Sequence, residues 1–271
     1  MNKYILSDLA CEISENNNTK EDRLGEKIVK KAFYSDIDGD KKFFVTFFTP
    51  KMWLLTDTEY FLLKEAITDE ILMTLERFSL TQRPCRILVV GIGNPRLTTD
   101  SLGVQTVEKI FITSADMSSK YQVMAIAPDV FGNTGIETVK AIKAYVNCIS
   151  PDLVIAVDSL KARHYERLAS TVQISDGGII PGSGVGNSNT SLSEDTLSVP
   201  VLSIGVPTVV SSSTLIYDAI NNCGADIDSQ ALITMLENGL DFLVALKEAD
   251  ILVKSAAMLI SDAINSAFTE R

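Results

Sequence analysis

The stretch at residues 86–103, which reads RILVVGIGNPRLTTDSLG, constrains the fold more than any other part of the chain. Four branched apolar residues, ILVV, stand together without polar alternation and are followed by Gly91 and Gly93. A parallel strand that is buried on both faces has this pattern. A turn-like segment, NPRLTTD, comes next, and apolar residues then recur at helical spacing from Leu102 to Phe111. The stretch therefore predicts a strand, a loop and a helix of an α/β sheet.

Asp100 lies in the predicted loop just before the helix, and two interpretations of it are open. Its side chain, or that of Thr99, can cap the helix by accepting a hydrogen bond from a backbone N–H. It can also be an active-site carboxylate, because open α/β sheets bind ligands outside the carboxyl ends of their strands. A second carboxylate, Asp158, stands at the end of another buried-strand pattern, PDLVIAV at residues 151–157. This second strand-end carboxylate favours the active-site interpretation.

The composition limits the classes of partner that the chain can bind. Hydrophobic residues make up 46% of its 271 residues, which is enough for a sizeable core, and no linker or repeat divides residues 1–271, so we expect one domain. The formal net charge of −11 argues against direct binding to nucleic acid or an anionic membrane, because both require clustered Lys and Arg. No run approaches the roughly 20 apolar residues of a membrane span, and Asp8 interrupts the apolar run that a signal peptide would need.

Cysteine and histidine are too few or too scattered for several common kinds of site. The four cysteines are far apart and form no CxxC pair, which is typical of reduced thiols in a cytoplasmic protein. His164 is the only histidine, so a His-based metal site or a Ser-His-Asp triad is nearly excluded. A mechanism that uses carboxylates alone, without a metal or a cofactor, remains.

The rest of the chain alternates between strand and helix patterns after a polar arm at residues 1–26. Strands are predicted at residues 27–34, 42–48, 121–127, 153–157, 171–174 and 201–206. Helices are predicted at residues 56–78, 135–149, 213–222, 229–246 and 247–268. The first two strands form a hairpin around the DIDGD turn at residues 36–40, whose spacing does not fit an EF-hand. The alternation predicts an α/β fold with a mostly parallel, doubly wound sheet and helices on both faces.

A glycine-rich loop at residues 175–187, SDGGIIPGSGVGN, lies between two of these strands. It has no GK[ST] ending, which argues against a P-loop, and the glycines at residues 91–93 are only a fragment of a dinucleotide-binding fingerprint. A loop of this composition also allows a peptide backbone to lie close to it.

Six motifs follow one another along the chain: VVGIGN, TTDSLG, GNTGIET, SPDLVIAVDSLKAR, TVQISDGGIIPGSGVGN and VPVLSIGVPTVV. In this order they resemble the germination proteases of endospore-forming bacteria, strongly over residues 86–210 and more weakly toward both ends. That family consists of atypical aspartic peptidases that degrade small acid-soluble spore proteins during germination. Its α/β fold is similar to that of hydrogenase-maturation endopeptidases. The resemblance implies a homo-oligomeric endopeptidase in the cytoplasm of the spore core, with small acid-soluble spore proteins as its substrate.

The resemblance also assigns roles to residues. The two catalytic aspartates of the family fall on Asp100 and Asp158, the pair already selected by its position at strand ends. The family is made as a zymogen that trims its own N-terminal arm after an acidic residue that is followed by an apolar residue, Ala and a nearby Glu. The sequence SDLACE at residues 7–12 fits this pattern. It implies self-cleavage between Asp8 and Leu9, with residues 1–8 as a propeptide arm.

Two aspartates are sufficient for peptide hydrolysis, since one can take a proton from water while the other protonates the leaving group. Carboxylates about 5 Å apart repel each other by about 3 kcal/mol at an effective dielectric constant near 20, which corresponds to roughly 2 pKa units. We expect Asp100 and Asp158 to share a proton and to titrate as a pair, so the sequence does not say which is the acid.

The chain departs from the family pattern at three positions and in one segment. Ile180 stands where the family usually has His, Ser211 where it has Asp, and His164 where it commonly has Ser, and the segment at residues 222–247 is shorter. Two alternatives therefore stay open, a maturation-type peptidase that trims the C-terminus of a partner enzyme and a paralogue that binds peptides without cleaving them. The scarcity of His and the GSGVGN loop argue against the first, and Ile180 and Ser211 raise the second.

Overall fold

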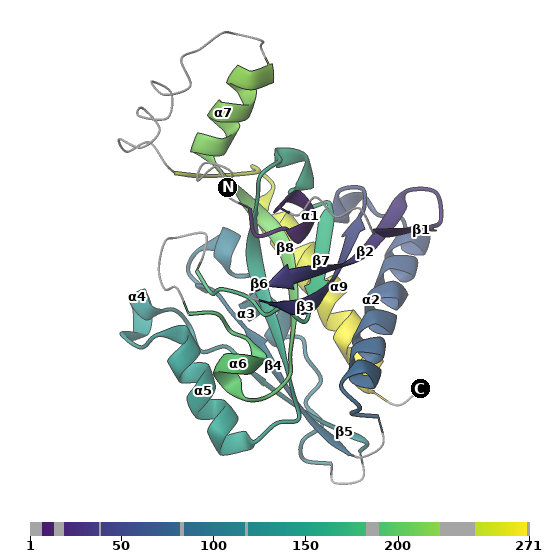
Figure 1. Ribbon diagram of the computed structural model, residues 1–271, viewed down its shortest axis with the longest axis vertical. Helices are drawn as coiled ribbons and strands as arrows, with labels where there is room; N and C mark the ends of the chain where they lie inside the picture. Colours follow the sequence, from purple (N-terminus) through teal and green to yellow (C-terminus); the bar gives the residue numbers. More distant parts are fainter. Residues whose placement is uncertain are drawn as a thin grey trace.

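The computed structural model describes residues 7–13, 19–37, 39–81, 84–116, 119–182, 190–222 and 242–269. Within these ranges a nine-stranded sheet has the order β1-β2-β3-β7-β8-β6-β4-β5, with β9 paired to β8 (Figure 1). The strands are β1 (Lys20–Leu24), β2 (Ile28–Ile37), β3 (Asp40–Phe48), β4 (Cys85–Gly91), β5 (Tyr121–Ile126), β6 (Leu153–Ala162), β7 (Thr171–Ser175), β8 (Val201–Ser211) and β9 (Leu243–Ala245).

The sheet has a parallel part and an antiparallel part. Strands β5, β4, β6 and β8 pair in parallel, while the other described pairings are antiparallel. The predicted α/β class, the central sheet and the N-terminal hairpin are confirmed. The parallel part is smaller than predicted because the β2–β3 hairpin joins the sheet through β7, which runs antiparallel to β8.

Helices cover both faces of the sheet, as predicted. Helices α2 (Asp57–Arg77), α3 (Leu102–Val107) and α9 (Ala249–Phe268) pack against one face and enclose the larger core. Helices α5 (Thr138–Ile149) and α6 (Glu194–Leu197) pack on the other face (Figure 1). The remaining described helices are α1 (Ala10–Ile13), α4 (Phe131–Thr134) and α7 (Ser212–Asn222), with 3-10 turns η1 (Met52–Leu54), η2 (Thr98–Asp100) and η3 (Tyr165–Arg167).

Helix α2 shows how closely local sequence specifies its element. Its N-cap is Thr56, whose side chain accepts a hydrogen bond from the Glu59 N–H at 3.3 Å, while the Glu59 carboxylate accepts one from the Thr56 N–H at 3.0 Å. This reciprocal pair satisfies two backbone donors at the start of the helix. The helix ends at Arg77, so the predicted helix at residues 56–78 is confirmed to within one residue at each end.

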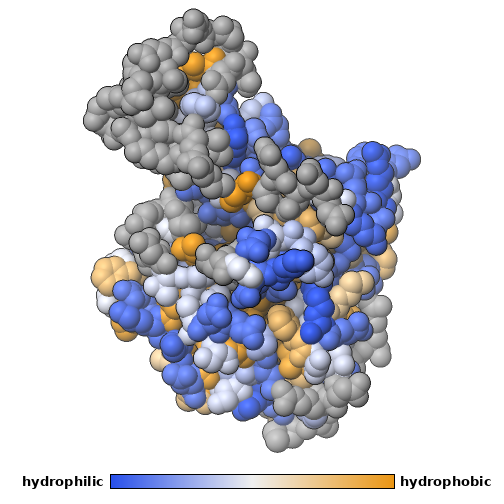
Figure 2. All heavy atoms as spheres, in the orientation of Figure 1, coloured by the Kyte–Doolittle hydropathy of each residue, from blue (hydrophilic) through white to orange (hydrophobic). Residues whose placement is uncertain are grey.

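The C-terminal helix α9 is long and apolar enough, by length and composition, to cross a membrane, yet 67% of its apolar stretch is buried inside the molecule. All seven residues predicted to form its apolar face are buried: Leu252, Ala256, Leu259, Ile260, Ala263, Ile264 and Ala267. The predicted packing of this helix against the sheet is therefore confirmed. On the face drawn in Figure 2, hydrophilic residues predominate and apolar residues show only in small groups.

Two predictions of secondary structure are wrong. Residues 20–24, assigned to a polar arm, form the edge strand β1, which pairs with β2. Residues 243–245, assigned to a helix, form β9 along the last part of β8. β1 is a polar edge strand whose own residues give no apolar pattern, and β9 depends on a partner more than 30 residues earlier in the chain, which explains the errors. The rest of the helix predicted at residues 229–246 lies mostly outside the described residues.

Candidate active site

The end of β4 and the start of α3 lie unusually close together, and three glycines allow it. A Cβ added to Gly91 would lie 2.2 Å from the Gly103 carbonyl oxygen, and one added to Gly103 would lie 2.3 Å from the Val157 carbonyl oxygen. Gly93 has a φ of +122°, and a Cβ on it would lie 1.8 Å from the carbonyl oxygen of Asp100. No side chain fits at these positions. The glycines therefore bring the Asp100 turn against the end of β4 and next to β6.

Asp100 occupies the last position of the η2 turn between β4 and α3. Its carboxylate accepts a hydrogen bond from the Asn94 N–H at 2.9 Å, and the Thr208 hydroxyl on β8 holds the turn by donating to the Thr99 carbonyl at 2.7 Å. The N-cap position of α3 belongs to Ser101, which makes no side-chain capping bond. The capping interpretation of Asp100 and Thr99 is therefore wrong, and the Asp100 carboxylate points back toward the end of β4.

Asp158 lies inside β6, not at its end as the sequence pattern predicted. The pairing of β4 with β6 stops at Val157, but β6 continues beside β8 as far as Ala162. The prediction failed because the pairing with β8, a distant segment, extends the strand beyond its apolar run. Asp158 thus follows the last residue of β6 that pairs with β4. Its side chain is 3% exposed and accepts a hydrogen bond from the Ser159 N–H at 2.7 Å.

Burial raises the pKa of both carboxyl groups, and the charge of Asp100 raises that of Asp158 further. For Asp158 the pKa lies well above its ordinary value, first because burial penalises the charged form and then because the negative charges of Asp100 and Asp8 act on it, against a smaller opposing effect of the Ser159 N–H. For Asp100 burial raises the pKa and the Asn94 N–H opposes it. The two aspartates are therefore close enough to interact, and Asp158 is the one that holds a proton more readily.

An open cavity of about 440 Å³ borders Asp100. The backbone of the β4 end, helix α4 and the last described part of the glycine-rich loop form its walls. Its lining includes Gly93, Asn94, Phe131, Pro181 and Gly182. Residues 183–189 of that loop lie outside the described residues. A cavity of this size accommodates a few residues of an extended peptide, so Asp100 has space beside it for a substrate.

The predicted cleavage site is in the docked N-terminal segment, residues 7–13, which includes α1. Asp8 is partly buried, and Leu9 is fully buried in a cluster with Leu160, Ala162 and Leu168. The backbone of Asp8 bonds to Lys161, three positions after Asp158 on β6. Asp8 and the aspartate pair therefore lie close together in space although 150 residues separate Asp8 from Asp158.

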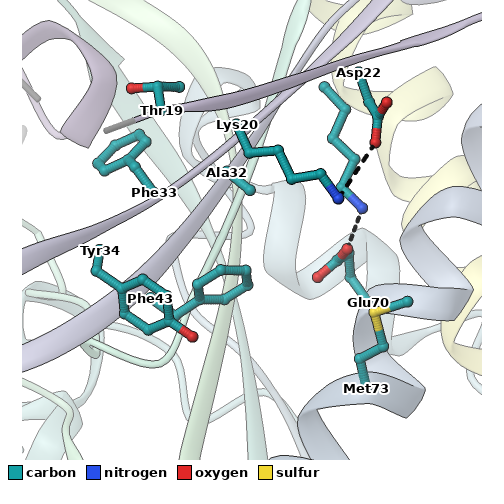
Figure 3. Close-up of a pocket in the computed structure, with 10 residues that line it drawn as sticks. Thr19, Lys20, Asp22, Ala32, Phe33, Tyr34, Phe43, Glu70 and Met73 are labelled. Carbon is teal, nitrogen blue, oxygen red and sulfur yellow. Dashed lines mark hydrogen bonds and ion pairs between the residues drawn. The ribbon is translucent and has the colours of Figure 1, made fainter. Parts of the chain in front are cut away.

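A different cavity, of about 470 Å³, lies beside the hairpin between β1, β2, β3 and α2. Figure 3 shows Glu70 and Met73 of α2 on one side and Phe33, Tyr34 and Phe43 on the other. Neither aspartate of the pair lines it. Across the described ranges, no group of three or more His, Cys, Asp or Glu side chains is placed to hold a metal ion.

Comparison with known proteins identifies the family. The family model of the germination protease matches residues 11–224. The germination protease of Caldanaerobacter subterraneus subsp. tengcongensis is 35% identical over 235 residues, which are 76% of this chain and 72% of the relative. The chain belongs to the germination protease family. This is a family of peptidases, and membership supports a hydrolase of peptide bonds with a role in the spore.

Other germination proteases match over shorter parts of their length. That of Clostridium perfringens (strain 13 / Type A) is 39% identical over 66% of this chain and 65% of its own. That of Bacillus subtilis (strain 168) is 44% identical over 56% of this chain and 44% of its own. The matched part of the chain thus spans about two thirds, or less, of these two relatives.

Among solved structures, the chain is similar to the [NiFe] hydrogenase maturation protease HycI from Thermococcus kodakarensis KOD1. The TM-score is 0.38 and the identity 15%, over 70% of this chain and 98% of that chain. The sequence predicts a fold similar to that of hydrogenase-maturation endopeptidases, and HycI is a hydrogenase maturation protease. At such a TM-score we base no argument about the site on it.

The three departures from the germination protease pattern lie in different surroundings. Ile180 is 44% exposed on the glycine-rich loop, where it lines a cavity beside Asp8. Ser211 is fully buried at the end of β8, and its hydroxyl hydrogen-bonds to Ser213 at 2.6 Å. His164 is partly exposed, with its Nδ1 3.6 Å from the Asp218 carboxylate on α7. None of them displaces Asp100 or Asp158.

Sequence reasoning missed Gln173 of β7, which contacts the N-terminal segment with both ends of its amide group. A polar residue within a short strand pattern gives no sign of such a role. Only the docking of a segment 163 residues earlier in the chain, at Ala10, reveals it.

Proposed function

We propose that the chain is an endopeptidase that degrades small acid-soluble spore proteins during germination, using Asp100 and Asp158 to activate water. The observation that carries this proposal is the buried Asp158 beside the more accessible Asp100, at the edge of an open cavity. Such pairs of carboxyl groups with unequal surroundings divide acid and base roles between them. Membership of the germination protease family supports a substrate in the spore.

The geometry supports one division of the two roles. Asp158 holds a proton more readily than Asp100, since burial and the charge of Asp100 raise its pKa well above the ordinary value, and it donates that proton to the leaving amine. Asp100 is less buried and keeps the Asn94 N–H as a partner for its negative charge, so it takes the proton from the attacking water. After cleavage the proton returns to Asp158, and the pair titrates jointly.

The test is cleavage of a spore-protein extract by the purified chain, followed by mass spectrometry of the fragments. D100N and D158N should each lower the rate of cleavage by about a hundredfold or more, as expected for the loss of a general acid or base. The circular dichroism spectrum should stay unchanged. D69N, a change of an exposed aspartate on α2, is the matched control and should cleave like the wild type. Binding without fragments would indicate the non-cleaving paralogue, and cleavage of a hydrogenase subunit alone would indicate a maturation-type peptidase.

The same proposal includes synthesis as a zymogen that cleaves itself between Asp8 and Leu9. Asp8 acts electrostatically on Asp158, so this bond is near the pair in the uncleaved chain. N-terminal sequencing after mild acidification should find Leu9 as the new first residue, and D158N should keep its original N-terminus. The protein is further proposed to be a homo-oligomer in the cytoplasm of the spore core, which light scattering of the purified chain and fractionation of spores would test.

A further inference from the structure

The N-terminal segment is bound to the sheet as a peptide ligand would be. The Asp8 N–H donates to the Lys161 carbonyl at 2.8 Å, and the Lys161 N–H donates to the Asp8 carboxylate at 2.8 Å. Gln173 spans the next residues, because its amide NH₂ donates to the Asp8 carbonyl at 3.0 Å and its amide oxygen accepts from the Ala10 N–H at 2.7 Å. Four hydrogen bonds thus hold three backbone groups, from Asp8 and Ala10, and the Asp8 carboxylate.

Two side chains of the segment fill closed sites. Leu9 is 0% exposed among apolar side chains that include Leu160, Ala162 and Leu168. Ala10, 8% exposed, packs in a small cluster with Phe33 and Phe44. By their shape and their apolar contacts, these two sites therefore favour an apolar residue at the position of Leu9 and a small residue at the position of Ala10.

The carboxylate of Glu12 occupies a third site, built largely from main-chain donors. It accepts hydrogen bonds from the N–H groups of Arg163 at 2.7 Å and His164 at 3.2 Å. The Ser7 hydroxyl donates to it at 2.5 Å, and the Arg167 guanidinium lies 3.9 Å away. The Glu12 side chain is only 3% exposed. Consecutive main-chain N–H groups of this kind bind anions, and here the anion is a glutamate carboxylate.

These sites adjoin the aspartate pair. Leu160 stands two positions after Asp158 on β6, so both side chains project from the same face of the strand. A cavity of about 430 Å³ is lined by Asp8, Ala10 and Gln173 together with the glycine-rich loop at residues 177–180. The segment bonds to β6 through Lys161 and to β7 through Gln173.

Resting on the proposed peptidase and zymogen functions, we propose that Gln173 is the positioning residue that reads the backbone of both the segment at residues 7–13 and an external substrate in this groove, and that the Arg163 and His164 N–H groups bind an acidic side chain of that substrate. The order of an acidic residue, an apolar residue, a small residue and a second acidic residue is the one that the resemblance to the germination proteases implies, and the structure adds the groups that bind it in the segment. The Lys161 main chain receives the first acid, and the Arg163 and His164 N–H groups receive the second. An external substrate binds only after the segment leaves.

Peptide binding tests this without requiring cleavage, since every protein in the experiment carries D158N. The probe is a fluorescent peptide, SDLASEI, which copies residues 7–13 with Ser in place of Cys11, and binding is read by fluorescence polarisation. The full-length chain with D158N alone should bind weakly, because its own segment competes at millimolar effective concentration. Adding L9A and E12Q weakens that segment and should tighten peptide binding at least tenfold.

The role of Gln173 is then tested in the protein that carries D158N, L9A and E12Q. Q173A should reduce peptide binding about tenfold, as expected for two lost hydrogen bonds. A peptide N-methylated at its Ala lacks the N–H that would donate to the Gln173 amide oxygen. It should bind the protein that retains Gln173 more weakly than the unmodified peptide does. The Q173A substitution should weaken its binding little further. A purely structural role for Gln173 would not produce this non-additivity. Q122A on β5, at the far edge of the sheet, is the matched control and should bind like its parent.

Equal binding with and without L9A and E12Q would overturn the inference, as would unchanged affinity on Q173A or strictly additive effects of Q173A and N-methylation. Its failure is distinguishable from failure of the proposed function. If the peptide binds as described but the wild-type chain cleaves nothing, the peptidase function is rejected and the peptide-binding groove is retained. If the wild-type chain cleaves its substrate but Q173A leaves the peptide affinity unchanged, the inference about the groove is rejected and the peptidase function is retained.

Discussion

Asp158 is a buried carboxyl group that the fold tolerates in its protonated form. Because its folded pKa lies above its unfolded value, near 3.9, the native state binds a proton more tightly than the unfolded chain. This contribution to stability is fully present below the unfolded pKa and is lost as the pH rises through the folded pKa. The site is therefore maintained at a cost in stability at neutral pH.

D158N should consequently be more stable than the wild type at pH 7, with a difference that shrinks as the pH falls toward 4. Asn keeps the shape of the side chain and removes the charge that burial and Asp100 disfavour. Urea unfolding at pH 4.5, 6 and 7.5 measures it. D69N, in an exposed position, should show no such trend, and a D158N chain that is equally destabilised at all three pH values would contradict the assignment.

The two aspartates could be predicted from the sequence because each follows an apolar run that forms a buried strand. Their exact surroundings could not. That Asp100 bonds to Asn94 and caps no helix depends on Gly93 and on Thr208, a hundred residues away. Gln173 could not be predicted at all, since its role arises only where a distant segment docks.

The β4–α3 junction is the element on which the position of Asp100 depends. G93A should move the η2 turn away, because the new methyl group would meet the Asp100 carbonyl at 1.8 Å and because the φ of +122° disfavours a side chain. The strain of such a backbone conformation alone costs roughly 1–3 kcal/mol. Both the free energy of unfolding and the rate of peptide cleavage should fall.

G132A on α4 is the matched control, since a Cβ there meets nothing within 4 Å and its φ is not positive. Its free energy of unfolding should equal that of the wild type or exceed it, because Ala reduces the freedom of the unfolded chain. Chemical denaturation measures the stability of both variants, and the extract-cleavage assay measures the effect of G93A on activity; G132A is a control for stability alone because Gly132 lines the cavity beside Asp100. If G93A cleaved at the wild-type rate, the position of the η2 turn would not matter to the chemistry.

The hairpin is joined to α2 by an ion pair between Lys30 of β2 and Glu70 of α2, at the edge of the cavity in Figure 3. Glu70 is 2% exposed, and its second oxygen has no hydrogen-bond partner among the described residues. Replacing Lys30 by Met would leave the Glu70 charge buried and unpaired, which costs about 3–5 kcal/mol. Thermal or urea unfolding should show that loss.

Two controls separate the loss of the pair from the loss of a lysine. K20M removes an exposed partner 4.0 Å from Asp22 and should cost between about 0 and 1 kcal/mol. The double variant K30M/E70L removes both charges and should regain most of the lost stability. A K30M chain as stable as K20M would show that Glu70 is protonated or hydrated in solution.

At the level of elements, local patterns sufficed for α2, α9, β4 and the β2–β3 hairpin, all of which have continuous apolar periodicity and clear ends. They did not suffice for β1, β9 or the direction of β7. All three strands are short. β1 is next to its partner β2 in sequence but is polar apart from Leu24, whereas β7 and β9 pair with the distant β8. Pairing between distant segments thus accounts for the errors at β7 and β9, as it does for the extension of β6 past Asp158.

In the whole molecule, one apolar core joins the two ends of the chain. Ile67 of α2 and Ile260 of α9 are both 0% exposed in the same cluster, which also contains hairpin, β4 and β6 residues. Trp53, the only tryptophan, packs against that cluster from the η1 turn. A shared core of this kind argues against division of the chain into two independent units.

The chain should therefore unfold in one cooperative transition, with Trp53 fluorescence and far-ultraviolet circular dichroism giving the same midpoint. I67A and I260A should each lower that common midpoint, by about 2–5 kcal/mol in free energy, because both create a cavity in the same core. The substitution near the N-terminus and the one near the C-terminus must shift both signals together. If I67A moved only the fluorescence transition and left a second transition at the wild-type midpoint, the N-terminal hairpin and α2 would be a separate folding unit, and the single-domain description would have to be replaced.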